Sequence, residues 1–130
     1  MKRPPFPTQD DLVRGFLDLL RSEHGTELHD ESFWTFMAMQ DLVEEFPDEA
    51  FAVVKELLKA DDWQHLVGQI AAGPIEDLLV HHGPRMIDCI EAEACANPRL
   101  KHALGGVWKS NSSPEIWTRV EAARGDPWNN

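Results

Sequence analysis

The sequence predicts an all-α fold, on three observations. Apolar residues recur at three- and four-residue steps through most of the chain, as expected for one buried face of a helix. No window alternates between apolar and polar residues with the period of two that a half-buried strand requires. Glycines and prolines fall between the apolar stretches, where helices begin and end. We therefore expect seven to eight short helices, packed as antiparallel hairpins in a compact bundle or a short superhelical array.

The first half of the chain is expected to form three helices. Thr8 can cap the first, because a threonine hydroxyl accepts a hydrogen bond from a free amide of the opening turn. Gly25 ends it. The second helix is expected over residues 30–46, because the proline that follows disfavours helical geometry in Phe46. Pro47 suits the first position of the third helix.

The second half is expected to form the remaining helices. Gly73 is expected to stop one helix, and Gly83 to separate the next two. Ser113 can cap the last helix. The expected ranges are 62–72, 75–82, 84–96, 98–104 and 114–124.

Length and composition favour one domain over residues 1–130, since single cores commonly span about 100–150 residues. The hydrophobic fraction of 42% and the charged fraction of 27% are typical of a soluble globular protein. No apolar run approaches the length needed to cross a bilayer, so no membrane span is expected. The start MKRPPFP leads into prolines and acidic residues instead of the apolar centre of a secretory signal, so we expect a cytoplasmic protein.

The two cysteines also favour the cytoplasm, which is a reducing compartment. Cys89 and Cys95 are six residues apart in one expected helix, roughly 9 Å along its axis. A disulfide rarely joins Cα atoms more than about 7 Å apart, so reduced thiols are expected.

The chain is strongly acidic. It has 23 Asp and Glu against 12 Lys and Arg, a formal net charge of −11, and the excess is concentrated in the first half. This charge repels phosphate backbones and anionic membranes, so direct nucleic-acid binding is not expected. A protein partner with a basic surface is the complementary expectation.

Residues 73–94 hold the densest set of candidate functional groups. Most have a structural explanation: Glu76 can bond back to a free amide of the helix start, and the two histidines can meet the last carbonyls before Gly83. Alternatively, Asp77 and His81 share a helix face, and a tight corner could bring them to the other acidic groups. The residues of this alternative site, for a small metal-dependent or acid/base enzyme, are Asp77, His81, His82, Asp88 and Glu91.

Diagnostic catalytic spacings are missing. The sequence has no HExxH, paired CxxC, GxSxG, GxGxxG or phosphate-binding GxxxxGK motif. We therefore expect no cofactor and no metal, and an enzyme is the less favoured class.

Four motifs of the second half occur in a fixed order. They are AGPIEDLLVHHG at residues 72–83, IEAEA at 90–94, LGGVW at 104–108 and IWTRV at 116–120. In these motifs the chain resembles an uncharacterised family of small bacterial all-helical proteins, a domain of unknown function. The resemblance implies a bacterial origin and a helical fold, and it brings no catalytic residues.

Five tryptophans stand out in a chain without tyrosine. Trp34, Trp63, Trp108 and Trp117 fall on apolar stripes and are expected in the core. Trp128 lies beyond the last expected helix and is expected to dock onto the body.

The leading functional hypothesis is a non-enzymatic acidic binding protein, an inhibitor or immunity-type module that blocks a basic surface of a partner protein. Helix ends and their loops are accessible, which favours them as the contact. The predicted acidic patch consists of Glu44, Glu45, Asp48, Glu49, Asp61 and Asp62. A structural adaptor or homodimer is a further alternative.

Overall fold

A computed structural model describes residues 8–110 and 112–127. Within these ranges the chain forms helices and no strand, so the all-α class is confirmed. The elements are α1 (Gln9–Arg21), α2 (Glu27–Ser32), α3 (Trp34–Glu45), α4 (Pro47–Leu57), α5 (Trp63–Ile70), a π-helical segment η1 (Ala71–Ile75), α6 (Glu76–Ala96), α7 (Pro98–Leu104) and α8 (Pro114–Ala123).

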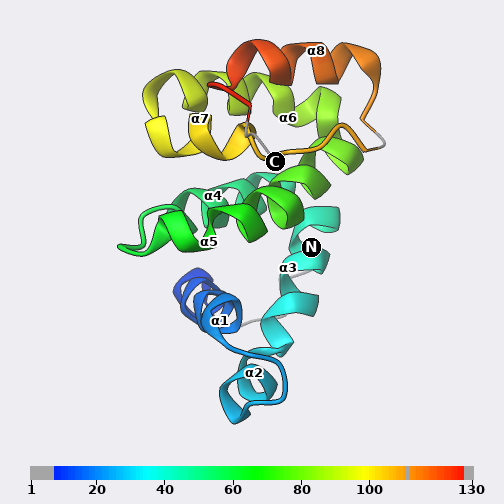
Figure 1. Cartoon of the computed structure of the whole chain (residues 1–130). Helices are drawn as coiled ribbons and strands as arrows, with labels where there is room; N and C mark the ends of the chain where they lie inside the picture. The colour runs from blue at the N-terminus through cyan, green and yellow to red at the C-terminus, as the bar shows by residue number, and fades with distance from the viewer. Residues whose placement is uncertain (1–7, 111, 128–130) are drawn as a thin grey trace.

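The helices lie in layers along a long axis (Figure 1). α6, α7 and α8 form one end, α4 and α5 lie in the middle, and α1 and α2 form the other end, which α3 connects to the middle. α6 packs on α8, and α3 packs on both α1 and α4. No helix of the described residues is long and apolar enough to cross a membrane.

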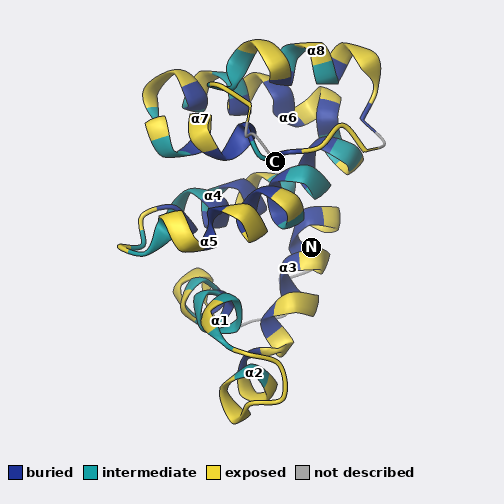
Figure 2. Cartoon of the chain, in the orientation of Figure 1, coloured by how far each residue is buried: buried dark blue, intermediate teal, exposed yellow. Residues whose placement is uncertain are grey.

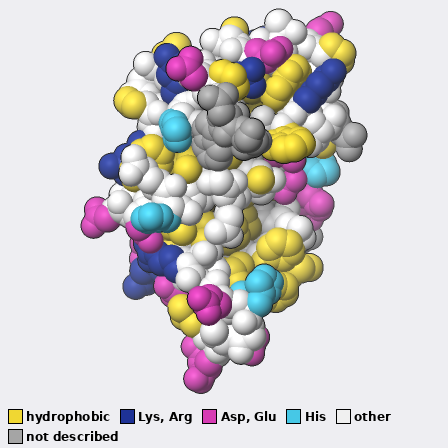
Figure 3. Space-filling view, in the orientation of Figure 1, with side chains coloured by type: hydrophobic (Ala, Val, Ile, Leu, Met, Phe, Trp, Pro, Cys, Tyr) yellow, Lys and Arg dark blue, Asp and Glu magenta, His cyan; other side chains and the backbone are white. Residues whose placement is uncertain are grey.

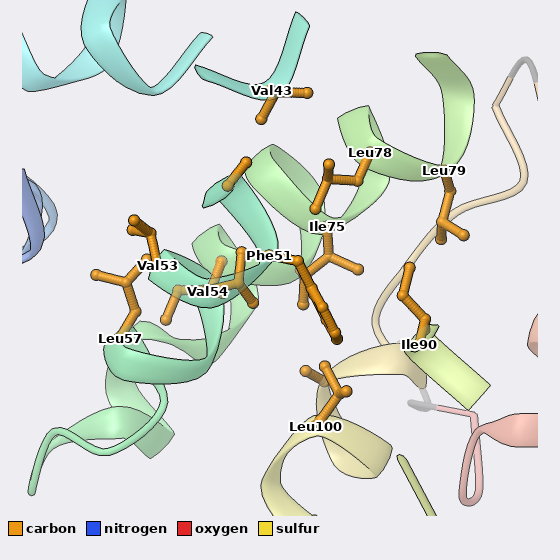
Figure 4. Close-up of a cluster of buried hydrophobic side chains, with 14 of the residues drawn as sticks. Val43, Phe51, Val53, Val54, Leu57, Ile75, Leu78, Leu79, Ile90 and Leu100 are labelled. Atoms are coloured by element: carbon orange, nitrogen blue, oxygen red, sulfur yellow. The ribbon is translucent and has the colours of Figure 1, made fainter. Parts of the chain in front are cut away.

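One hydrophobic cluster runs through all the layers. It extends from Leu12 of α1 to Val120 of α8, on the faces that the helices turn inward (Figure 2). At its centre Phe51 of α4 points toward Leu100 of α7, with Ile75 of η1 beside it (Figure 4). All three side chains are almost fully buried, so the layers share a single core.

The second expected helix is divided in two. Thr26 caps α2 by accepting a hydrogen bond from the backbone amide of His29 at 3.2 Å, so helix begins three residues before the expected range. Ser32 and Thr35 then turn their hydroxyls back onto carbonyls of the preceding turn, which competes with regular helix at Phe33. The expected cap of α1 is confirmed, since Thr8 accepts from the amide of Asp11 at 3.0 Å.

The expected stop at Gly73 is wrong. α5 continues through η1 into α6, so helical backbone runs through Gly73 without a break, from residue 63 to the kink at His82. Pro74 lies inside this run and has no amide hydrogen to give to the carbonyl four residues earlier. The backbone accommodates it by widening, and the amide of Glu76 bonds to the carbonyl of Ala71, five residues back.

The separation expected at Gly83 is a kink within α6. Pro84 removes a second amide, and His82 takes a non-helical conformation with φ −136° and ψ 29°. Nε2 of His82 lies 3.1 Å from the backbone oxygen of Glu44, and in the tautomer with hydrogen on Nε2 it donates to this carbonyl at the end of α3. Arg85 pairs with Asp48 at the start of α4, at 2.8 Å. The kink thus ties α6 to the junction of α3 and α4.

The tryptophans are only partly in the core. Trp63 and Trp117 pack against it, with the guanidinium groups of Arg99 and Arg124 over their rings. Trp34 and Trp108 are 42% and 66% exposed, so their expected burial is wrong. The predicted docking of Trp128 lies outside the described residues. Cys89 and Cys95 are both free and exposed.

Two glycines permit close packing of helices. A Cβ at Gly15 of α1 would lie 2.6 Å from Cγ2 of the buried Thr35, closer than real atoms approach. A Cβ at Gly83 would lie 3.0 Å from Ile116 of α8. In contrast, a Cβ at Gly73 would meet no atom within 4 Å.

These distances predict opposite effects of two alanine substitutions. Gly15→Ala is expected to lower the free energy of unfolding by about 1–3 kcal/mol, because α1 must move away from α3. Gly73→Ala is the matched control and is expected to be neutral or slightly stabilising, because alanine restricts the unfolded chain. Urea denaturation measures both. Equal stabilities of the two variants would contradict the close approach of α1 and α3.

Candidate functional site

An apolar groove lies between α1, α2, α3 and the η1–α6 junction. Its volume is about 420 Å³. Phe16, Leu19 and Leu20 of α1 line it on one side, and Phe36 and Met39 of α3 on the other. Hydrophobic side chains gather on the surface over α3, next to a histidine (Figure 3).

A row of rings follows the α2 and α3 side of the groove. The centroids of His24 and His29 are 4.6 Å apart, and those of His29 and Phe33 are 5.6 Å apart. Phe33 stacks on Phe36 at 5.5 Å. These four rings all line the groove and offer flat surfaces to an apolar ligand.

The proline bulge forms the opposite wall. Gly73 and Pro74 of η1 line the groove, and Asp77 follows one turn later, in the first turn of α6. Gly73 has no side chain to fill the space in front of it. Gly73, Pro74 and Asp77 therefore form a wall of the groove, and no helix boundary lies at Gly73.

Among the described residues that line the groove, Asp77 is the only Asp or Glu. Burial raises the pKa of its carboxyl above the ordinary value, and the negative charges of Glu76 and Glu44 raise it further, while His81 acts in the opposite direction. Among the described side chains, none forms a hydrogen bond or an ion pair with this carboxylate. The groove thus holds a half-buried carboxyl group that has no hydrogen-bond or ion-pair partner among the described side chains.

An exposed apolar surface adjoins the groove. Five of the six large hydrophobic side chains that are exposed within residues 8–110 and 112–127 belong to α2, α3 and the residue between them. We name this surface the α2–α3 patch; it consists of Leu28, Phe33, Trp34, Phe36 and Met37. Clustered exposure of this kind is typical of an interaction surface.

The segment that contains the patch has acidic residues and no Lys or Arg. Residues 22–54 contain nine Asp and Glu and no Lys or Arg. All five residues of the α2–α3 patch lie within this segment.

The structure places the residues of the predicted acidic patch at the two ends of α4. Glu44, Glu45, Asp48 and Glu49 lie where α3 meets α4, whereas Asp61 and Asp62 follow the far end of α4, a helix about 16 Å long. Asp48 pairs with Arg85, at 2.8 Å. Asp62 accepts two hydrogen bonds of 2.8 Å from Arg21, which lower the pKa of its carboxyl. A role of these six residues in partner contact remains a prediction.

The residues of the alternative enzyme site form two groups with different partners: Asp77 lies near His81, and Asp88 and Glu91 share Arg119. Asp77 lines the groove, and His82 bonds to α3. Asp88 and Glu91 both pair with Arg119 of α8, which holds the pKa of the Glu91 carboxyl below its usual range. His81 and His82 have ring centroids 6.4 Å apart. In the described part of the chain, no group of three or more His, Cys, Asp or Glu side chains could hold a metal ion.

Sequence reasoning missed the groove. It identified Asp77, but not His24, His29, Phe33 or Phe36. Two signals were available: α3 carries apolar residues on more faces than one core stripe needs, and a long segment lacks Lys and Arg.

Comparison with protein families assigns the chain to one family. A family model described as a family of unknown function (DUF6869) matches residues 22–127, and the chain belongs to this family. The matched range includes α2, α3 and the η1–α6 junction. No curated protein and no solved structure matches the chain.

The unpartnered carboxylate predicts that Asp77→Asn stabilises the protein at pH 7. Because the pKa of Asp77 is higher in the folded chain than the ordinary 3.8, ionisation costs folding stability as pH rises through the folded-state pKa. The asparagine variant avoids this cost, and its advantage should disappear below pH 3.8, where the carboxyl is protonated in both states.

Urea denaturation between pH 3 and pH 7 measures this difference. Asp41→Asn is the control, because it removes an exposed carboxylate of α3. An advantage of Asp77→Asn that is independent of pH would show that the charge of Asp77 is not its source.

Proposed function

We propose that this protein is an acidic binding protein that blocks a partner protein by taking an apolar, positively charged segment of it into the groove. The observation that carries the proposal is the α2–α3 patch, an exposed apolar surface beside a groove, in a segment with nine carboxylates and no Lys or Arg. An inhibitor or immunity-type role would follow if the bound segment belongs to the partner's own functional surface.

The apolar side chains account for affinity. Phe33 and Phe36 are 45% and 41% exposed, and both reach the groove. Fully burying an exposed side chain of this size is worth about 1.5–3 kcal/mol, so covering the exposed part of both rings gains roughly half of that for each. Large aromatic side chains at the centre of an interface often dominate its energetics.

The carboxylates account for selectivity. A net charge of −11 attracts positively charged partners and accelerates their encounter, and it repels nucleic acids and anionic membranes. The attraction is screened by salt, whereas apolar contact is not. A partner that uses both contributions should bind more weakly, but still measurably, at high salt.

The same charges disfavour a homodimer through this surface. In a symmetric dimer the same segment lies on both sides of the contact. Residues 22–54 would then face a second copy of a segment that carries nine carboxylates and no Lys or Arg. A partner of opposite charge avoids this repulsion.

The cysteines support a cytoplasmic location within this proposal. Both cysteines are free and exposed, which fits a reducing compartment. The order of the four C-terminal motifs supports a bacterial source.

A designed peptide tests the proposal. We expect a helical peptide of roughly four turns, with leucines on one face and lysines on the other, to bind with an affinity that falls between about 0.15 M and about 0.5 M salt without vanishing. Replacing both Phe33 and Phe36 by alanine should weaken binding at least about tenfold. Fluorescence anisotropy of the labelled peptide measures these affinities.

Trp108→Ala is the matched control. Trp108 is also aromatic and 66% exposed, but it lies outside the α2–α3 patch, so its removal should leave the affinity unchanged. An equal loss with Trp108→Ala, or no loss with the phenylalanine variant, would contradict the proposed surface. A peptide with glutamate in place of every lysine should not bind.

A further inference from the structure

We propose that Asp77 anchors one lysine or arginine side chain of the bound segment, and so acts as the specificity-determining residue of the groove. The recognised segment would then place a single cation between apolar side chains. This inference rests on the proposed function, since it names what that same groove selects.

Asp77 lies in the wall of the groove. Its carboxylate is half-buried beside Gly73 and Pro74, in a wall of an otherwise mainly apolar groove. A negative charge removed from water without a partner costs free energy, and a cation that enters the groove recovers it. Gly73 leaves the space next to this wall open, because nothing lies within 4 Å of where its Cβ would be.

The Lys and Arg side chains of the surrounding helices are already paired. The elements that line the groove, α1, α2, α3, α5, η1 and α6, carry only three Lys or Arg residues. Arg14 pairs with two aspartates of its own helix, Arg21 pairs with Asp62, and Arg85 pairs with Asp48. Among the described residues, no Lys or Arg of these elements is left to pair with Asp77, and a cation from the bound molecule would complement it.

The groove fits a side chain with a long apolar stem and a charged end. Lysine and arginine have long aliphatic stems that can lie along the rings of Phe16, Phe33 and Phe36 while the charged end reaches a carboxylate. Aromatic faces also attract a cation directly. The side-chain amide of Gln69 donates to the backbone of Leu20 at 3.4 Å, and its oxygen can accept a hydrogen bond from an ammonium or guanidinium.

The charge of the neighbourhood favours a cation over a neutral donor. Glu44 and Glu76 lie close enough to Asp77 to disfavour its ionisation. A cation bound there is attracted by all three carboxylates, whereas a neutral hydrogen-bond donor gains little from the two more distant ones. An anion would be repelled.

Selection from a display library of random short peptides tests the inference. The targets are the wild-type protein, Asp77→Asn, Asp41→Asn as the matched carboxylate control, and the variant with both Phe33 and Phe36 replaced by alanine. We expect peptides selected on the wild type and on Asp41→Asn to share apolar positions and one fixed Lys or Arg. Peptides selected on Asp77→Asn should keep the apolar positions and lose the fixed cation.

Affinities of a selected peptide then measure the coupling between its fixed cation and Asp77. Replacing its fixed Lys by norleucine, which removes the charge and keeps the stem, should weaken binding to the wild type at least about tenfold and binding to Asp77→Asn far less. An equal loss for both proteins would overturn the role of Asp77 and assign the preference to the general negative charge. If no peptide prefers the wild type over the phenylalanine variant, the proposed function itself fails.

A small amine distinguishes the source of the cation. n-Butylammonium should compete far more weakly than the peptide, because it lacks the apolar contacts along α3. Competition at the same concentration as the peptide would assign the groove to free amines and overturn a protein segment as its occupant.

Discussion

The structure depends on one missing hydrogen atom, the amide hydrogen that Pro74 lacks. Because the carbonyl four residues earlier cannot be paired in the regular way, the helical run of residues 63–96 widens at η1 without ending. This run contacts α1, α3, α4, α7 and α8, so its path decides where the other helices can lie. The widened turn also brings Gly73 and Asp77 into the wall of the groove.

The groove exists because the packing of the first three helices stops short of this wall. Gly15 lets α1 approach α3 closely at Thr35, and the contact leaves the rings of Phe33 and Phe36 half-exposed. A protein selected for stability alone would cover these rings and remove the charge of Asp77. That both features persist beside each other, in a segment without Lys or Arg, favours a surface shaped for binding.

The all-α class and several helix starts could be predicted from the sequence because they depend on local physics. Thr8 and Ser113 cap their helices as expected, through hydrogen bonds within one turn. The stop expected at Gly73 is wrong, because the helical backbone widens at Pro74 and continues, whereas the break expected at Gly83 is present as the kink at His82. The groove could not be predicted, since it joins residues from His24 to Asp77 that only the tertiary packing brings together.

The central claim is that partner contact is confined to one end of the molecule, and nuclear magnetic resonance mapping tests it most directly. Backbone amide shifts of the isotope-labelled protein would be followed as a leucine–lysine amphipathic peptide is added. The account predicts changes over α2, α3 and the residues 73–77 that wall the groove, and none over α7 and α8. Changes centred on Asp61 and the far end of α4, or spread evenly over the acidic surface, would contradict it.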